Sequence, residues 1–454
     1  MIANFLALTA GLAATVSAFD CNGPYFSFYN RVGPAMSIQR LDPAVSPGQE
    51  SSHLHSFDGG NGLALDTTFA GLQSSTCTSA RIKPDNSLYW RPTLFWNGNN
   101  TGFYRVPEKY LKVYYKFGDA GNVRANVTEF PENFQMLAGD AFKRADGANP
   151  GGITWACLGP NYSRIETNGF PNGFTSCADG FTTQITFPSC WNGQDINPKN
   201  ASAHMAYPSN SGTGLDACPT GFKTARFPTI FIEYWYDVSA FDGQYKSTDT
   251  PWVLAQGDPT GFGWHADFRN GWAPGVLGKA IAPEGYCNCG CGCGNDQMKT
   301  CFGQDQVNDD QDATFKSCAA NDAFPGDDKV VLDKLPGCNP IQAGPSPATL
   351  ASGPDCTAAA ASAAGGSNST SAYDDAVSTS AAASTSAVAS ATTLVSSTKA
   401  AATSSKKPRT SKTKTAASST ISEANDNVVY VTQVVHETVT AAIKHKRHGR
   451  VHMQ

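Results

Sequence analysis

Two pairs of side chains in this sequence have a spacing that suits acid–base or metal chemistry. His53 and His55 are separated by one residue, and so are His265 and Asp267. Residues i and i+2 of a β-strand point to the same face of a sheet, so each pair would present both side chains on one side. On neighbouring strands the four groups would form a polar centre that can transfer protons or bind a divalent metal. The alternative is that His53 and His55 face solvent.

Other candidate site residues lie close to these pairs or share their chemistry. His204 stands alone before an apolar step, where a hydrogen-bonded core histidine is the alternative. Trp264 and Trp272 flank the second pair, and such rings either stack on sugars or fill a core. The predicted catalytic residues are His53, His55, His265, Asp267, His204 and Asp58. The predicted substrate-binding residues are Trp264, Trp272, Arg269, Tyr207, Arg91 and Trp90.

The sequence lacks the motifs of several enzyme classes. It contains no Gly-x-Ser-x-Gly elbow, phosphate-binding loop, dinucleotide fingerprint or His-Glu-x-x-His helix. A glycosidase of the usual kind needs two carboxyl groups about 5 to 9 Å apart, and sequence spacing selects no such pair here. Elimination from a uronide instead needs a base and a cation that neutralises the substrate carboxylate, for which Arg91, Tyr207 and Arg269 are candidates.

Short apolar and aromatic segments separated by turn residues predict a mainly β fold. Gly, Pro, Asn or Asp interrupts the stretch 20–286 about every eight to twelve residues, and long amphipathic helical windows are absent. Residues 87–96, 111–115 and 229–236 alternate as strands do. We therefore expect one large antiparallel β-sandwich over residues 19–286, jelly-roll-like, with long loops.

Three features indicate export from the cell. Residues 1–18 combine an apolar run with Val16-Ser17-Ala18, the small-residue pattern that a signal peptidase recognises. The 14 cysteines form an even number, which suits disulfide formation in an oxidising compartment. Glycosylation sequons begin at Asn99, Asn126, Asn161, Asn200 and Asn368. We therefore expect an extracellular, secreted protein, associated with a cell wall, that has no transmembrane span.

The last third of the chain changes in composition. Residues 287–356 hold a Cys-x-Cys-x-Cys-x-Cys run and four later cysteines, which predicts a small disulfide-rich appendage packed on the sandwich. Binding of a soft metal by the four close cysteines is the alternative. Residues 357–454 are dominated by Ser, Thr and Ala and end in basic residues, which predicts a disordered, O-glycosylated tail. Four of the eight histidines fall in this tail: His436, His445, His448 and His452.

The charge of the chain indicates which partners it can bind. The chain carries 38 Asp and Glu against 33 Lys and Arg, with a net charge of −5, and many of the basic residues are in the tail. An acidic body lacks the excess of Lys and Arg that a protein needs to bind phosphates, so no nucleic-acid partner is expected. We expect a monomer.

Several longer segments, in order, resemble one family. They are Asp42–Gly48, Ser52–His55, Tyr89–Leu94, Phe134–Asp140, Cys190–Gly193, His204–Pro208, Gly257–Gly261, His265–Trp272 and Leu335–Pro340. Over roughly residues 40–345 the sequence resembles the secreted fungal family called domain of unknown function nineteen-ninety-six. Some members of that family are joined to WSC modules, which are associated with cell-wall glycans. The resemblance therefore implies, by association, a polysaccharide partner.

Together these observations predict a secreted fungal protein that acts on cell-wall or plant polysaccharide. Glycan cleavage at the His/Asp centre, by hydrolysis or by elimination, is the leading hypothesis. The first alternative is a non-catalytic wall protein that binds glycan, and the second is a metal-binding secreted protein. No cofactor is expected, although a divalent metal at the histidine cluster is an alternative to proton transfer.

Overall fold

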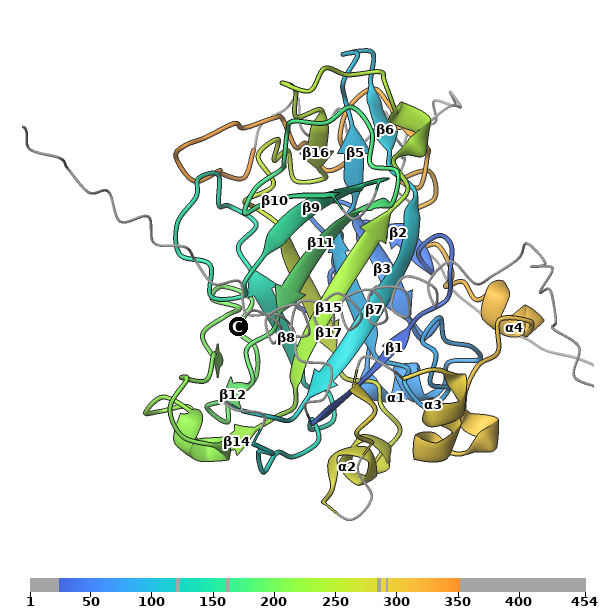
Figure 1. Cartoon of the computed structure of the whole chain (residues 1–454), viewed down its shortest axis with the longest axis vertical. Coiled ribbons are helices and arrows are strands. Elements are labelled where there is room, and N and C mark those ends of the chain that lie inside the picture. Colours follow the sequence, from blue (N-terminus) through green and yellow to red (C-terminus); the bar gives the residue numbers. More distant parts are fainter. Residues whose placement is uncertain (1–23, 120–122, 161–162, 284–286, 291–292, 352–454) are drawn as a thin grey trace, which may run out of the picture. The chain divides into compact units, whose positions relative to one another are not determined.

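The computed structural model describes residues 24–119, 123–160, 163–283, 287–290 and 293–351. Two antiparallel sheets dominate it, and Figure 1 shows the six-stranded sheet crossing in front of the other. The six-stranded sheet has the order β1 (Tyr25–Tyr29), β7 (Glu108–Lys116), β15 (Thr229–Tyr236), β11 (Gly180–Thr186), β9 (Thr154–Gly159) and β10 (Ser163–Thr167). The five-stranded sheet has the order β2 (Ser37–Gln39), β3 (His55–Gly59), β4 (Leu88–Pro92), β17 (His265–Arg269) and β8 (Gln135–Gly139). The prediction of a mainly β, antiparallel fold is confirmed, and the segment 229–236 forms β15 as predicted.

Alternation of side chains explains how the two sheets pack. In β15 every second residue from Ile230 to Tyr236 is buried, so one face of the strand lies in the core. Tyr234 meets Trp264 at 5.4 Å between ring centroids. Tyr89 of β4 contacts the hydroxyl of Tyr115 of β7. The inner faces of the two sheets therefore form one aromatic core.

The five-stranded sheet is also covered on its outer face. A second apolar cluster there joins Phe57 of β3 and Trp90 of β4, stacked at 5.7 Å, to Leu41 and Leu72 from the surrounding loops and α1 (Phe69–Gln73). All residues of β3, β4 and β17 are consequently buried. Polar groups on this outer face thus lie beneath loops instead of in open solvent.

Smaller elements surround the two sheets. One sheet contains β16 (Trp252–Leu254), β5 (Leu94–Trp96), β6 (Phe103–Arg105) and β18 (Val331–Leu332), and the other contains β13 (Met205–Ala206), β12 (Cys190–Trp191) and β14 (Ala225–Arg226). The remaining helices are α2 (Val276–Ile281), α3 (Asn295–Phe302) and α4 (Ala313–Lys316), with short 3-10 turns at Gly214–Ala217, Ser239–Phe241 and Gln304–Gln306. Among the described residues, no helix is both long enough and apolar enough to span a membrane.

Disulfides tie the described part of the Cys-rich segment to the β domain and within itself. Cys77 bonds to Cys318 across 241 residues, and Cys287–Cys301 and Cys289–Cys293 close short loops. Phe302 of α3 packs on Phe26 and Trp272. Two further bonds, Cys157–Cys177 and Cys190–Cys218, lie inside the β domain. The described cysteines of the 287–293 run are thus in disulfides. The predicted signal peptide and tail lie outside the described residues.

The packing of the core predicts one pH effect on stability. Asp85 is fully buried, accepts hydrogen bonds from the Tyr89 hydroxyl at 2.7 Å and the Ser87 amide at 3.1 Å, and has its pKa raised by burial to about 6. Because the folded protein holds this proton more tightly than the unfolded chain does, protonation of Asp85 stabilises the fold. This contribution is complete below about pH 4 and is lost as the pH rises through about 6.

Asp85→Asn is expected to abolish this dependence. A shift of about two units corresponds to about 3 kcal/mol, so the stability difference between wild type and variant should change by about that amount between pH 4 and pH 7. Urea unfolding at the two pH values measures the difference. Parallel pH profiles for the two proteins would contradict the assignment.

Candidate functional site

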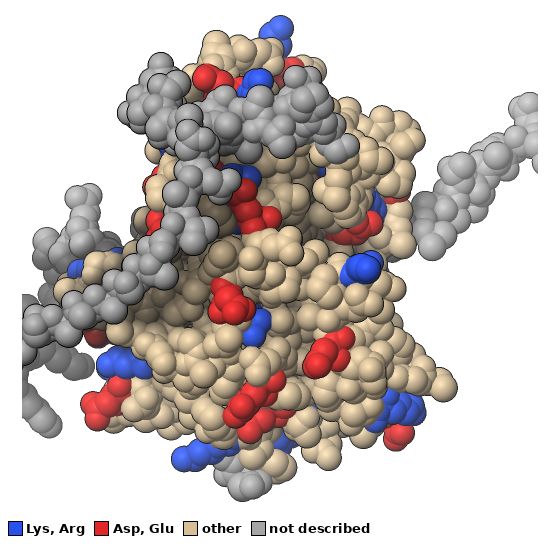
Figure 2. Space-filling view, turned by 180° about the vertical axis from the view of Figure 1, so that it is seen from behind, with Lys and Arg blue, Asp and Glu red and all other residues tan. Residues whose placement is uncertain are grey.

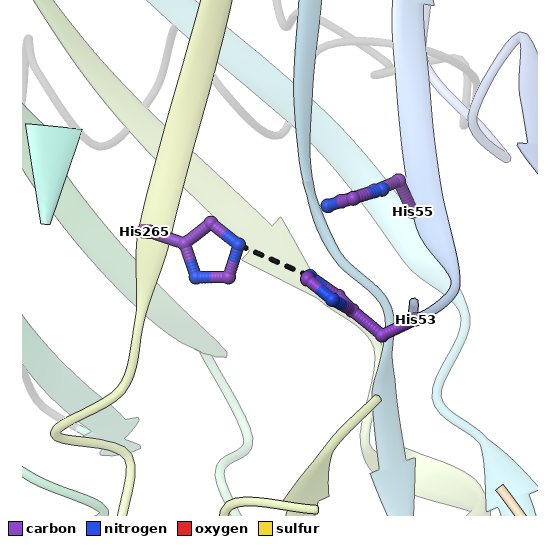
Figure 3. Close-up of side chains that lie close together, drawn as sticks. All are labelled: His53, His55 and His265. Atoms are coloured by element: carbon purple, nitrogen blue, oxygen red, sulfur yellow. Dashed lines mark hydrogen bonds between the residues drawn. The ribbon is translucent and has the colours of Figure 1, made fainter. Parts of the chain in front are cut away.

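Three histidines converge on the outer face of the five-stranded sheet. His55 is the first residue of β3, His265 is the first residue of β17, and His53 lies in the bend before β3. The Nε2 atoms of His53 and His265 are 3.2 Å apart, although 212 residues separate them in the sequence. Figure 3 shows the three rings at the corners of a triangle, with His53 and His55 on one side and His265 opposite them. The predicted convergence of these residues is thus present in the structure.

The register of the sheet explains the convergence. β4 lies between β3 and β17, and Pro92 of β4 pairs with His55. Asp267 pairs with Trp90 of β4, which places His265 beside Pro92 on the other side. His55 and His265 therefore flank Pro92, and their ring centroids are 6.0 Å apart. On β8, Gly139 pairs with His265, and a Cβ there would come within 2.4 Å of the Trp264 carbonyl oxygen.

Backbone carbonyls fix the orientation of two of the rings. The Nδ1–H of His55 donates to the Leu41 carbonyl at 2.8 Å, and that of His265 donates to the Gly263 carbonyl at 3.0 Å. Nδ1 of His53 lies 3.1 Å from the Ser52 hydroxyl, which can accept or donate. Since a carbonyl oxygen only accepts, His55 and His265 in their neutral form carry an unprotonated Nε2.

Burial keeps the imidazoles neutral. It lowers the pKa of His55 and of His265 to about 4, and for His265 the neighbouring His55 acts in the same direction. Burial, with His55, His265 and Arg144, also lowers the pKa of His53 well below its ordinary value. The centre therefore holds three bases instead of three cations.

A cleft of about 540 Å³ opens onto this centre. His53, His265 and Asp267 line this cleft. Five loops contribute further lining residues, among them Asp42, Asp140, Phe142, Arg144, Lys199, Gln256 and Asn339. Figure 2, which views the molecule from behind, shows acidic and basic side chains in small groups on a surface that is mostly uncharged.

Two carboxyl groups in the cleft have raised pKa values. Burial, together with the neighbouring Asp42, raises the pKa of Asp267 well above its ordinary value. Burial also raises the pKa of Asp42, although the amides of Ala44 and Val45 donate to its Oδ1 and oppose the shift. Oδ2 of Asp267 is buried and has no hydrogen-bond partner among the described residues. A carboxyl group that holds its proton more tightly than an ordinary carboxyl thus lies in the same cleft as neutral imidazole bases.

Asp58 and Arg91, both predicted site residues, lie on the opposite face of the sheet. Arg91 forms an ion pair with Asp58 and lies 3.9 Å from Glu108, and its guanidinium stacks over the Tyr234 ring at 4.9 Å. Asp58 is three residues from His55, so on a strand it points the other way. These two residues belong to the core between the sheets instead of the cleft.

The three predicted tryptophans are core residues in this structure. Trp264 is fully buried and packs on Trp155 at 5.1 Å. Trp272 is 3% exposed and donates from Nε1 to the Tyr115 hydroxyl at 2.8 Å. Trp90 is fully buried in the outer-face cluster. None of them offers an open ring face to a sugar. They fill the core, which was the alternative to sugar binding for such rings.

The last three predicted residues lie apart from the histidine centre. His204 and Arg269 line a neighbouring cavity of about 330 Å³. Nε2 of His204 donates to the Gln135 carbonyl at 2.8 Å, and Arg269 donates to Asn133 at 3.1 Å. Tyr207 donates its hydroxyl to the Thr186 carbonyl at 2.9 Å, and burial raises its pKa. None of the three lines the main cleft.

Several residues that line the cleft were not predicted as site residues from the sequence. Asp42 opens the segment Asp42–Gly48, and Asp140 closes the segment Phe134–Asp140, so both were visible in the segments that carry the family resemblance. Arg144, Gln256 and Phe142 lie on loops whose positions depend on tertiary contacts. No period in the sequence identifies them.

The histidine cluster is also the one group with metal-binding geometry among the residues that the structure describes. One ring nitrogen of each histidine lies within 4.8 Å of the other two. Imidazole nitrogens of this kind are ligands for zinc and copper.

The fold and this site define a disulfide-bonded, mainly β protein with a three-histidine centre, two members of which line a cleft. A family model described as "Domain of unknown function (DUF1996)" matches residues 42–272. The chain belongs to this family, as its resemblance predicted. The match includes all four histidines of the β domain and ends at Trp272. No curated protein and no solved structure matches the chain.

Proposed function

We propose that this protein is an extracellular fungal enzyme that cleaves polysaccharide of cell walls or plants in the cleft above the histidine centre. One observation carries the proposal: neutral imidazoles of His53 and His265 and the protonation-prone carboxyl of Asp267 share one cleft. Bond cleavage by acid–base catalysis needs a proton acceptor and a proton donor at the same place. The cleft supplies both.

Hydrogen-bonding groups in the cleft suit a substrate rich in hydroxyls. Oδ2 of Asp267 and Oε1 of Gln256 are buried acceptors without a partner among the described residues. A sugar hydroxyl can donate to either. Phe142 lines the same cleft and is 42% exposed, so its ring is available for stacking on a sugar. These features replace the buried tryptophans as a basis for glycan recognition.

The same groups have definite roles in either cleavage reaction. In hydrolysis, Asp267 donates its proton to the departing glycosidic oxygen while a neutral imidazole of His53 or His265 accepts a proton from the attacking water. In elimination, the imidazole removes the proton next to the uronide carboxylate, a C=C bond forms as the C–O bond to the leaving sugar breaks, and Asp267 protonates the departing oxygen. Lys199 at the cleft neutralises the carboxylate. Both schemes use the lowered pKa values of the histidines.

Disulfides and sequons support the extracellular location. Five disulfides join described residues, and such bonds persist in oxidising compartments. The sequon residues Asn99, Asn126 and Asn200 are exposed, as glycosylation requires.

The test is incubation of the secreted full-length protein with a panel of fungal and plant polysaccharides. New reducing ends without ultraviolet absorbance are expected for hydrolysis, and absorbance from unsaturated uronides is expected for elimination. An inactive preparation that is retained on one glycan in a pull-down would instead indicate a wall-binding protein. Absence of both product and retention across the panel would reject a glycan as the ligand.

A further inference from the structure

We propose that His53, His55 and His265 bind a divalent transition metal, Zn²⁺ or Cu²⁺, through the ring nitrogens that face one another. The inference goes beyond the proposed function, because metal binding is measured without any glycan and stands or falls by itself. It rests on the geometry of the three side chains and of the groups behind them.

The hydrogen bonds behind the rings decide which nitrogens are available. Nδ1 of His55 and Nδ1 of His265 donate to the carbonyls of Leu41 and Gly263, so a lone pair remains on each Nε2. Histidines that bind metals commonly donate their other ring N–H to a carbonyl or carboxylate, which fixes the ring. Two of the three rings are therefore already held in the orientation of a ligand.

Nε2 of His55 is an acceptor that lacks a donor. His55 is fully buried, and its Nε2 has no hydrogen-bond partner within the described residues. An unpaired buried acceptor costs about 1–3 kcal/mol, so such groups are rare without a reason. A metal ion at the centre of the cluster would occupy this lone pair.

His53 can serve both the metal-free and the metal-bound form. Without metal, its Nε2–H donates to Nε2 of His265 at 3.2 Å while its Nδ1 accepts from the Ser52 hydroxyl. With metal, its proton moves to Nδ1, which then donates to the same hydroxyl. Because the Ser52 hydroxyl both donates and accepts, the change requires no backbone movement.

Distances and access fit a metal ion. Two nitrogens bound tetrahedrally at about 2.0–2.1 Å lie about 3.3 Å apart, which is close to the 3.2 Å between His53 and His265. Only modest closure of His55 is needed, since the three nitrogens already lie within 4.8 Å. His53 and His265 line the cleft, so a fourth position would face it. Three protein ligands with an open position are typical of catalytic zinc sites.

The charges around the cluster suit a dication. Asp42 and Asp140 lie close enough to His265 to interact with it electrostatically, and both line the cleft. The cation that acts on His53 is Arg144, which is itself 3.6 Å from Asp258 and donates to backbone carbonyls. The protein thus offers three neutral ligands, with Asp140 in the wall of the cleft and the charge of Arg144 offset by Asp258. Imidazole ligands favour Zn²⁺ and Cu²⁺ over Mg²⁺ and Ca²⁺.

A bound metal of this class would supply an activated water at neutral pH. The three imidazoles would hold the ion, and such a water would occupy the position that faces the cleft, which Asp267 also lines. Asp267 is two residues from His265 on the same sheet face but outside the metal-binding group.

The experiment measures metal in the full-length secreted protein, purified without a histidine tag and without chelators. Every protein compared, including the reference called wild type below, carries Gln at His436, His445, His448 and His452, so that the tail contributes no imidazole. Elemental analysis should find about one metal ion per chain, and the apoprotein should bind Zn²⁺ or Cu²⁺ with a Kd below about 1 µM. Binding should also raise the melting temperature.

Matched variants locate the site. His55→Gln is expected to lose the metal, whereas His204→Gln, a buried histidine of the neighbouring cavity, is expected to keep it. Ser52→Ala should weaken binding about tenfold while leaving the fold intact. With Cu²⁺, nitrogen hyperfine splitting in the electron paramagnetic resonance spectrum should be present in wild type and absent or reduced in His55→Gln.

Two results would overturn the proposal. One is wild-type protein that carries no metal and binds neither ion below the stated Kd. The other is equal metal content in wild type and His55→Gln. Neither result depends on glycan cleavage, and an active enzyme without metal would leave the proposed function standing.

Discussion

Replacing His265 by glutamine is expected to lower the kcat/KM for glycan cleavage about a thousandfold, which is the usual effect of losing an acid–base group. His265 lines the cleft, and its Nε2 lies 3.2 Å from His53. Glutamine is of similar size, but it cannot accept a proton as imidazole does. The loss is expected whether His265 accepts a proton or binds a metal, so this variant tests the site and not the metal.

His204→Gln is the matched control. It removes a buried histidine from the same domain, but from a cavity that does not contain the histidine cluster. It should keep activity within about threefold of wild type, because no acid–base group of the main cleft is lost. Near-ultraviolet circular dichroism and melting temperature establish that both variants are folded. More than about a tenth of wild-type activity in folded His265→Gln would rule out a catalytic role for the cluster.

The sequence predicted the histidine centre because its members are close to strands of period two. His55 and His265 begin β3 and β17, as the pairs His53/His55 and His265/Asp267 suggested. The structure differs from this prediction in two respects: β4 lies between the two strands, which are therefore not neighbours, and His53 precedes β3 instead of lying in it. Pro92 of β4 lies between His55 and His265 in this register, which the sequence alone does not give.

Other site residues depended on information that one sequence does not hold. Parity along β3 separates Asp58 from His55, so its placement in the core could have been predicted from the strand alone. Asp42, Arg144 and Gln256 reach the cleft from loops, whose positions follow from tertiary contacts. The sequence around Trp264 fits a sugar-binding ring and a core residue equally well. Its contact with Trp155 in the structure shows that it is a core residue.

Arg91→Met is expected to destabilise the fold by about 4 kcal/mol, because it removes one partner of a buried ion pair and leaves the other charge uncompensated. Arg91 is 2% exposed, and it is the cation paired with Asp58 and close to Glu108. Both carboxyl groups are also buried, so water cannot replace the guanidinium. Its stacking over Tyr234 would be lost as well. Urea unfolding at neutral pH measures the change.

A compensated variant separates a structural role of Arg91 from substrate binding. Adding Asp58→Asn and Glu108→Gln to Arg91→Met removes the stranded charges, and most of the lost stability should return because neutral groups replace the whole network. If Arg91 instead neutralised a uronide in the cleft, Arg91→Met would keep its stability and raise KM for acidic glycans. The placement of Arg91 on the inner face of β4, across the sheet from His55 and His265, makes the first outcome the expected one.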